Sequence, residues 1–312
     1  MRKFKYYFQY IVILIFFTLF KILGLKISLI FSSLIFKFFG PIFRKNKIGE
    51  KNLSYAFKNI DHNEKQKILK TMWGNYGKIF AEYMFIKNFR NDPKISKKIT
   101  IKNKEILEKI KKDPKPVIFI SGHFNNFEFM AMQIEKYGID LATIYRPLNN
   151  IFLNPIMEKI RQKYICKNQI QKGLPGMKNL LKKFKNGTSI ALMIDQRVSE
   201  GIKSNFFEKK AFTTTIPAQF VKKYNAKIVP VYINRLKNDE FVIRFQEPLV
   251  FNEIENIEQP EICFIGKMRH DIHLEDGDHF CQFHLATAVN IKRKGSKLAC
   301  LYSDNVCEYD SP

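Results

Sequence analysis

The pattern of apolar and polar residues changes twice along the chain. Residues 6–20 and 27–43 are almost wholly apolar, and the second stretch is interrupted by Lys37. From residue 49 to residue 87, apolar residues recur every three or four positions, as on one face of a helix. The first part of the chain is therefore predicted to be an apolar anchor helix followed by a helical lead-in, which Asn91-Asp92-Pro93 terminates.

After residue 100, short apolar runs alternate with segments of helical periodicity. This alternation predicts an α/β domain in which helices cover a sheet. A polar turn at residues 237–239 separates the last two runs, so they are predicted to form a hairpin and the sheet to be mixed. The predicted strands are residues 116–121, 141–145, 190–195, 227–234 and 241–246. The predicted helices are residues 127–137, 153–164, 176–184 and 217–224.

These patterns divide the chain into four predicted parts. They are a membrane anchor at residues 1–45, a helical lead-in at 46–100, an α/β domain at 101–258 and an atypical tail at 259–312. The tail has a different composition, since four of the five cysteines follow residue 260. A zinc site could be sought at His279, Cys281 and His284, but their spacing matches no strong ligand pattern, so no metal is predicted.

Charge and composition indicate an anionic partner beside a membrane. Lys and Arg number 53 against 29 Asp and Glu, and the chain contains 30 Phe. The first apolar run is slightly short for a spanning helix of about 20 residues, although Lys21 could snorkel and residues 22–25 could extend it. The charged start also fits a signal peptide, but no A-x-A-like cleavage site follows. More Lys and Arg follow the anchor than precede it, which predicts a cytoplasmic body, and the lack of paired cysteines agrees with a reducing compartment.

The segment SGHFNNFEFM (residues 121–130) contains the most distinctive candidate chemistry. His123 would lie in a turn between a strand and a helix, and Glu128 in the first helical turn, where its carboxylate could lean towards the imidazole. A histidine held by a carboxylate can take a proton from an alcohol. The spacing alone favours the structural alternative, in which Asn125 and Glu128 cap the helix and His123 is a packed turn residue.

The same segment resembles a known family when it is taken with three later blocks. His123 and Glu128 resemble the H-x4-D/E motif of the lysophospholipid acyltransferase superfamily, in the glutamate form of the late acyltransferases of lipid A biosynthesis. The three further blocks, similar in order and spacing, are Tyr145-Arg146-Pro147-Leu148-Asn149-Asn150, Asp195-Gln196, and Phe206-Phe207 with Ala211-Phe212-Thr213-Thr214-Thr215. The similarity spans about residues 1–250 and extends to Asn52–Phe57 and Phe80–Tyr83.

This resemblance implies a reaction and a set of site residues. It implies transfer of a fatty acyl chain from acyl carrier protein, the co-substrate, to a hydroxyl of a Kdo-bearing lipid A precursor, without a cofactor or a metal. It implies an enzyme of the bacterial inner membrane whose catalytic domain faces the cytoplasm. His123 would be the general base and Glu128 its orienting partner. Arg146 would bind a phosphate or the thioester oxygen, and Asn126, Asp195 and Gln196 would contribute to substrate binding. For Asp195, orientation of Arg146 or of a helix end is an equal alternative.

Two alternatives stay open from the sequence. One is an acyltransferase of the same superfamily that acts on a lysophospholipid, a glycerol phosphate or a glycolipid. The other is a basic, membrane-tethered binding protein without catalysis, although no helix-turn-helix or aromatic RNA motif suggests nucleic acid as its partner. The chain departs from the family at its end, where a tryptophan-bearing helix is usual, because its one Trp is Trp73.

Overall fold

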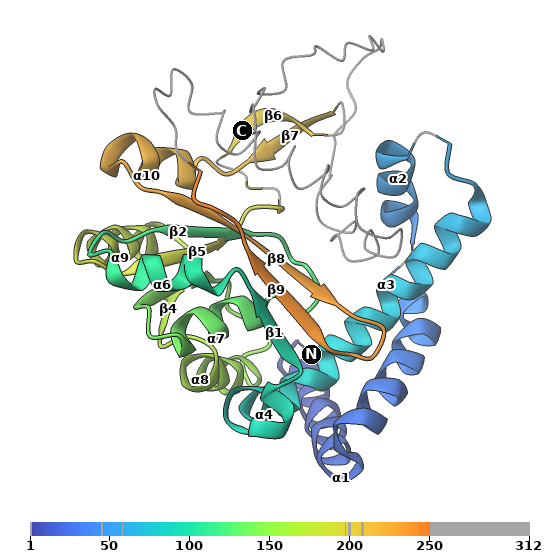
Figure 1. Ribbon diagram of the computed structural model, residues 1–312. Helices are drawn as coiled ribbons and strands as arrows, with labels where there is room; N and C mark the ends of the chain where they lie inside the picture. Colours follow the sequence, from blue (N-terminus) through green and yellow to red (C-terminus); the bar gives the residue numbers. More distant parts are fainter. Residues whose placement is uncertain are drawn as a thin grey trace.

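The computed structural model describes residues 2–249 except residues 45, 58, 197, 199, 200, 207 and 208. The predicted tail at 259–312, including His279, Cys281 and His284, lies outside these residues. Helices form the first third of the described chain (Figure 1). They are α1 (Arg2–Phe43), α2 (Lys47–Ala56), α3 (His62–Glu82), a 3-10 turn (Tyr83–Phe85), α4 (Ile86–Asn91) and α5 (Pro93–Ser96).

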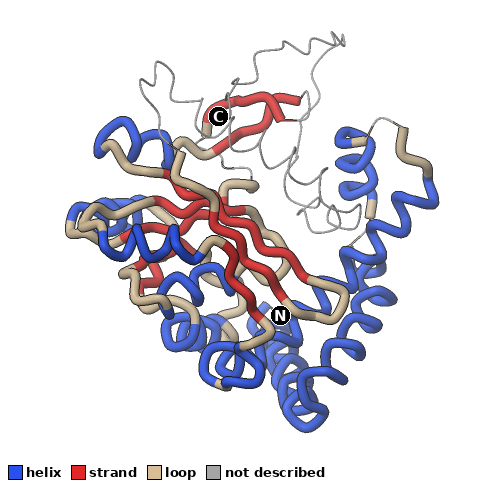
Figure 2. Tube along the Cα trace, in the orientation of Figure 1, coloured by secondary structure: helices blue, strands red, loops and turns tan. Residues whose placement is uncertain are grey.

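A mixed sheet surrounded by helices forms the rest of the described chain (Figure 2), which confirms the predicted fold class. Its strands are β1 (Ile99–Lys102), β2 (Ile118–Ser121), β3 (Leu141–Tyr145), β4 (Asn168–Gln171), β5 (Ser189–Met193), β8 (Ile228–Arg235) and β9 (Phe241–Phe245). The helices between them are α6 (Lys104–Lys112), α7 (Glu128–Lys136), α8 (Asn154–Tyr164), α9 (Leu174–Lys185) and α10 (Ile216–Tyr224). A separate hairpin is made by β6 (Ile202–Phe206) and β7 (Lys209–Thr213).

The order of the strands places β2, β5 and β8 in the middle of the sheet, where most of their side chains are buried. The sheet order is β1-β9-β8-β2-β5-β3-β4, and β8, β2, β5, β3 and β4 are mutually parallel. Strand β9 is antiparallel to β8, as the predicted hairpin requires. All four residues of β2 are buried, because helices cover both faces of a parallel strand. The carboxyl ends of the five parallel strands therefore form one edge, which is where ligands bind in open α/β sheets.

Helix α1 is not one straight rod but two arms. Gly24 has φ 73° and ψ 169°, a left-handed conformation that glycine adopts readily and other residues rarely do. The first arm (residues 2–23) and the second arm (residues 25–43) meet at this kink, and the second arm returns beside α3 (Figure 1). The Ser28 hydroxyl donates to the carbonyls of Phe20 (3.1 Å) and Gly24 (2.7 Å). These bonds satisfy carbonyl groups that the break in the helix leaves exposed.

The backbone of α3 lies in direct contact with the backbone of the second arm of α1. A Cβ atom built on Gly77 would lie 2.3 Å from the carbonyl oxygen of Ser32, so only glycine fits there. The Ser32 hydroxyl donates to the carbonyl of Gly77 at 2.7 Å. The first arm also contacts α3, since the rings of Phe17 and Phe20 lie 5.5 and 5.9 Å from that of Phe80. Helix α3 is thus enclosed by α1 on one side and by the β8–β9 hairpin on the other (Figure 1).

Candidate active site

The loop between β2 and α7 is fixed by its own polar side chains. Ser121 is fully buried and donates from its hydroxyl to the carbonyl of Val231 at 2.7 Å. The Phe124 N–H donates to the carbonyl of Gly122 at 2.7 Å, which turns the chain sharply after the strand. Asn125 has a positive φ of 46° and donates from its amide to the carbonyl of Ile233 at 2.9 Å. The loop is thereby bound to β8 on both sides of His123.

The two ring nitrogens of His123 contact Asp195 and Gln196. The Asp195 carboxylate accepts the backbone N–H of His123 at 2.8 Å and lies 2.7 Å from Nδ1. The amide of Gln196 lies 3.1 Å from Nε2. A carboxylate at Nδ1 favours the tautomer that carries its proton there, so Nε2 has a lone pair to accept the amide N–H or a substrate proton. The ring is therefore oriented with Nδ1 towards Asp195 and Nε2 towards Gln196.

The predicted contact between Glu128 and His123 is wrong. Glu128 is the first residue of α7, and its carboxylate faces the 3-10 turn after α3 and helix α8 instead. It accepts hydrogen bonds from Tyr83 and from the Arg161 guanidinium, whose Nη2 lies 2.8 Å away. The physical reason is competition, because a partly buried guanidinium binds a carboxylate more strongly than a neutral imidazole does. Asp195, which follows β5 beside β2, takes the place against the imidazole.

Tyr83 and Arg161, which both contact the Glu128 carboxylate, have shifted pKa values. Burial and the neighbouring Glu128 carboxylate raise the pKa of Tyr83 well above its usual value, so its hydroxyl stays protonated and donates. Burial lowers the pKa of Arg161, but pairing with Glu128 and Tyr83 raises it on balance. Sequence reasoning missed Arg161 and Tyr83 as members of the site. Tyr83 lies in a segment that the family resemblance had indicated, whereas Arg161 gave no signal beyond being a basic residue on a predicted helix.

The predicted helix cap, with Asn125 as capping residue and Glu128 three residues on, is also wrong. Helix α7 begins after Phe127 without a side-chain cap, because the side chains of Asn125 and Asn126 are held by Ile233 and Glu82 and do not face the helix end. Asn126 is fully buried, and its amide donates to the Glu82 carboxylate at 2.9 Å. Asn126 therefore positions the loop through Glu82, and its contribution to substrate binding stays a prediction.

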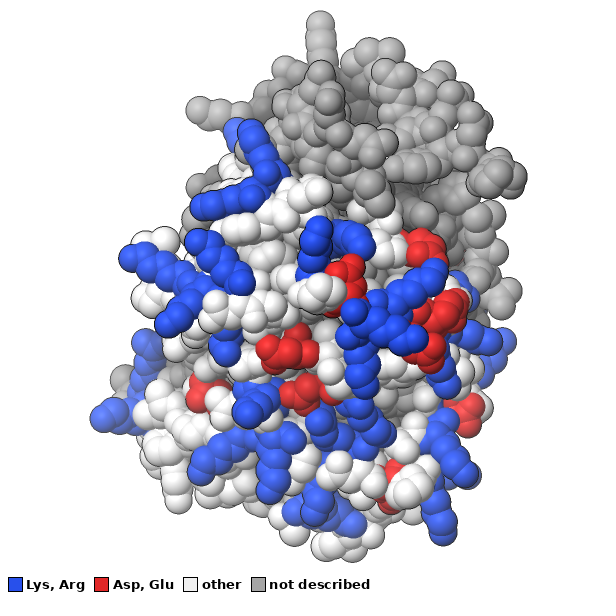
Figure 3. Space-filling model, turned by 60° about the vertical axis from the view of Figure 1, so that its left-hand side comes forward, with Lys and Arg blue, Asp and Glu red and all other residues white. Residues whose placement is uncertain are grey.

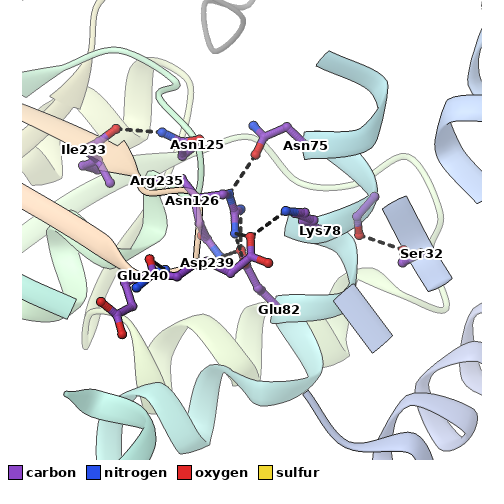
Figure 4. Close-up of polar contacts among 12 residues, drawn as sticks. Ser32, Asn75, Lys78, Glu82, Asn125, Asn126, Ile233, Arg235, Asp239 and Glu240 are labelled. Carbon is purple, nitrogen blue, oxygen red and sulfur yellow. Dashed lines mark hydrogen bonds and ion pairs between the residues drawn. The ribbon is translucent and has the colours of Figure 1, made fainter. Parts of the chain in front are cut away.

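A buried ion pair lies behind the loop and connects it to α3 and β8. Figure 4 shows Asn126, Glu82 and Arg235 meeting from the loop, α3 and β8. Glu82 is fully buried and pairs with both nitrogens of the Arg235 fork. The same guanidinium donates to Asn75 at 3.0 Å and lies over the ring of Phe241. Such a pair is satisfied only when all three segments are in place, so it fixes their relative positions.

Arg146 lies at the same edge of the sheet, directly after β3, and its side chain is exposed. Within the described part of the chain, no hydrogen bond or ion pair of its guanidinium is found, and Asp195 is engaged by His123 instead. The segment around Arg146 is itself ordered, since the Tyr145 hydroxyl donates to Glu158 at 2.6 Å. An exposed guanidinium at this edge of the sheet could bind a phosphate or a carbonyl oxygen. Among the described residues, no group of His, Cys, Asp and Glu side chains could hold a metal ion.

The carboxyl edge of this α/β sheet thus carries an imidazole that Asp195 orients and the exposed side chain of Arg146. The comparison with known families names the class of protein. The family model of the bacterial lipid A biosynthesis acyltransferases matches residues 1–260, so the chain belongs to this family. A search of curated proteins found no significant match. The predictions of an acyltransferase and of the lipid A branch are thereby confirmed.

Proposed function

We propose that this acyltransferase moves a fatty acyl chain from the thioester of acyl carrier protein to a hydroxyl of a Kdo-bearing lipid A precursor, with His123 as general base. The observation that carries the proposal is the imidazole held by Asp195 at Nδ1 and exposed to an incoming hydroxyl at Nε2. Family membership supports the lipid A precursor as acceptor. No cofactor is needed, because the thioester supplies the activated acyl group.

The chemistry follows from the position of the proton. Gln196 leaves Nε2, and the acceptor hydroxyl takes its place. Nε2 then accepts the hydroxyl proton while the oxygen attacks the thioester carbonyl, and a C–O bond forms. The tetrahedral intermediate collapses with cleavage of the C–S bond, and the imidazolium returns the proton to the leaving thiolate. Asp195 stabilises the imidazolium formed between these steps, which is the role of a carboxylate behind a histidine base.

Glu128 and Arg146 have supporting roles in this proposal. Glu128 holds Arg161 and fixes the start of α7, so it stabilises the loop that carries His123. Arg146 binds a phosphate of the acceptor or the thioester oxygen, since its guanidinium is exposed at the same edge. The basic surface supports an acidic carrier protein and an anionic lipid as partners. Figure 3 shows Lys and Arg side chains over most of one face of the described chain, with acidic side chains between them.

The test is acyl transfer by the full chain from an acyl carrier protein thioester to a Kdo-lipid A precursor, read as the mass of the lipid product. We expect the wild type to add one acyl chain and His123→Ala to lose about 10²–10⁴-fold in rate, the range of general base catalysis. His62→Ala is the matched control, because His62 is exposed at the start of α3. The proposal fails if His123→Ala is as fast as the wild type. Transfer only to a lysophospholipid, a glycerol phosphate or another glycolipid would give the reaction a different acceptor.

A further inference from the structure

Helix α9 carries a stripe of exposed, mostly basic side chains. At 3.6 residues per turn, four of its exposed residues lie within about 80° of one another around the helix and extend over about 16 Å of its length. These residues, called the α9 stripe from here on, are Leu174, Lys178, Lys182 and Lys185. The other side of the helix packs on β3, β4 and β5 and buries Leu180 and Phe184. The stripe therefore faces away from the sheet.

No acidic residue offsets the charge of the stripe. The sequence of α9, LPGMKNLLKKFK, contains neither Asp nor Glu. The carboxylates of the adjoining segments are engaged elsewhere, since Asp140 accepts from Asn168 and Thr188, and Glu158 accepts from Tyr145. Within the part of the chain that the structure describes, the lysines of the stripe form no ion pair. They therefore present positive charge to a partner.

The amino end of α9 lies at the edge of the sheet that carries the candidate active site. The neighbouring parallel strands β4, β3, β5 and β2 lead, in that order, into Lys172, Arg146, Asp195 and His123. The Lys172 N–H donates to the carbonyl of Tyr145 at 2.8 Å, so Lys172 and Arg146 follow each other across the edge. Strands are about 4.8 Å apart, so this edge measures about 14 Å from β4 to β2. A partner on the stripe could reach the histidine with a long flexible arm.

The start of α9 is fixed by a close backbone contact. A Cβ atom built on Gly176 would overlap the carbonyl oxygen of Gln171, the last residue of β4, so only glycine allows this approach. Leu174 precedes it by two positions and is 82% exposed. A large apolar side chain held in this way, with lysines beside it, combines the apolar centre and the charged rim that protein interfaces have.

Charge and position favour an acidic protein over a lipid surface as the occupant of the stripe. Helix α1, which is long and apolar enough to cross a membrane, lies well away from α9 in Figure 1. A helix that binds a membrane presents a continuous apolar face, whereas the stripe has a single apolar residue at one end. An acidic helix laid along the stripe could pair with its lysines and place an apolar side chain against Leu174. Acyl carrier protein has this chemistry, because its arm is attached at the start of an acidic helix.

We propose that the α9 stripe is the docking surface for acyl carrier protein. An acidic helix of the carrier lies along the lysines of the stripe, and its arm-bearing end meets Leu174 and Lys172 at the edge of the sheet. The arm extends from there past Arg146 and brings the thioester to His123. This docking deepens the proposed function, on which it rests for the identity of the donor.

Binding of holo-acyl carrier protein, which carries the arm without an acyl group, tests the docking surface without acyl transfer. The full chain in detergent micelles is titrated against a fluorescently labelled carrier at low ionic strength, and anisotropy gives Kd. We expect Lys178→Glu with Lys182→Glu to raise Kd about tenfold or more, because repulsion replaces attraction at two positions. The matched control is Lys104→Glu with Lys112→Glu on α6, which makes the same change in net charge at two exposed lysines and should change Kd less than about twofold. Equal weakening by both pairs of substitutions would overturn the proposal.

A carrier with reversed charge separates direct pairing from damage to the fold. In this carrier, lysines replace the acidic residues of the arm-bearing helix. We expect it to bind the chain with Lys178→Glu and Lys182→Glu more tightly than it binds the wild type, and the opposite preference would overturn the proposal. Flotation with vesicles of anionic phospholipid examines the other occupant. If the same substitutions release the chain from vesicles and leave Kd for the carrier unchanged, the stripe binds lipid and the proposal is wrong.

Acyl transfer distinguishes a failure of this docking surface from a failure of the proposed function. We expect the α9 substitutions to lower kcat/KM for the acyl carrier protein thioester by the factor that they raise Kd, and to leave kcat/KM for a small acyl thioester unchanged. Carrier binding at the stripe by a wild type that transfers no acyl chain would support the docking surface and contradict the proposed function. Transfer from the carrier thioester that the α9 substitutions do not slow would contradict the docking surface alone.

Discussion

At the scale of single residues, Asp195 is the side chain that decides the chemical state of His123. Its carboxylate accepts both the backbone N–H and the Nδ1 proton of His123, so it fixes the position and the tautomer together. Glu128 has a different environment, in which Tyr83 and Arg161 compete for its oxygens. The two carboxylates thus have separate roles. Asp195 orients the imidazole of His123, and Glu128 holds the start of α7 next to the loop that carries His123.

Replacement of Asp195 by asparagine tests this division. The amide would donate to Nδ1, and the proton would move to Nε2, where it blocks acceptance of the substrate proton. We expect Asp195→Asn to lower kcat by about 10²–10⁴-fold with little change in KM, and Glu128→Gln to have a smaller effect on kcat. Steady-state kinetics of both variants against pH provides the measurement. If Glu128→Gln were the slower of the two variants in kcat at every pH, Glu128 would be the partner of the base.

The sequence indicated which residues meet at the site but not how they pair. His123, Glu128, Asp195 and Gln196 were all expected there, and all lie at the same edge of the sheet. Their pairing depends on Arg161 and Tyr83, which come from two helices that are far apart in the chain. Because hydrogen-bond competition among buried groups is settled by tertiary packing, the motif spacing alone could not assign Asp195 to His123 in place of Glu128.

At the scale of elements, α3 connects α1 with the sheet. Its Glu82 forms the buried pair with Arg235 of β8, and its Lys78 pairs with Asp239 at 2.6 Å (Figure 4). The pair of Glu82 and Arg235 is almost fully buried, with side-chain exposures of 6% for Arg235 and 0% for Glu82. Buried pairs of this kind are costly to break from one side, because the remaining charge has no water.

A double-mutant cycle measures what this pair contributes. We expect Glu82→Gln or Arg235→Met alone to lower the free energy of unfolding by about 3–5 kcal/mol, and the double variant to lose less than the sum. Denaturant unfolding in detergent micelles gives the values. Lys227→Met is the matched control, because Lys227 pairs with Asp113 at the surface and its loss should change stability far less. Additive losses in the double variant would show that the two charges are not coupled.

The periodic strands were predictable, whereas the short edge elements were not. Strand β3 has the predicted bounds, and β2, β5, β8 and β9 differ from prediction by one or two residues at their ends. Strands β1 and β4 were missed, because their sequences, ITIK and NQIQ, contain polar residues and do not form a continuous apolar run. Edge strands are held by one neighbour and the helix above it, so their assignment depends on tertiary contacts that no local pattern contains.

At the scale of the whole molecule, the excess of basic residues would attract anionic partners electrostatically. The net charge of +24 far exceeds what solubility requires of a chain of this size. A field of this strength attracts an acidic protein before contact and raises the rate of encounter, and salt screens it. The effect should therefore be visible in the second-order rate constant and not in the chemical step.

Salt dependence of the reaction provides the measurement. We expect kcat/KM for the acyl carrier protein thioester to fall steeply as ionic strength rises above about 0.1 M, where the Debye length is about 10 Å, while kcat changes little. A small acyl thioester without the carrier protein is the matched control and should show a much weaker dependence. Equal salt dependence for both donors would remove electrostatic attraction of the carrier as the cause.

The order in which the buried pair is assembled has a consequence for the timing of activity during synthesis. Glu82 leaves the ribosome early, and Arg235 follows 153 positions later in the chain. Until Arg235 has emerged, Glu82 lacks its partner, and Asn126 has no anchored acceptor for the loop that carries His123. A nascent chain that ends before β8 should therefore be inactive, and activity should arise in one late step, once Arg235 has been synthesised and paired.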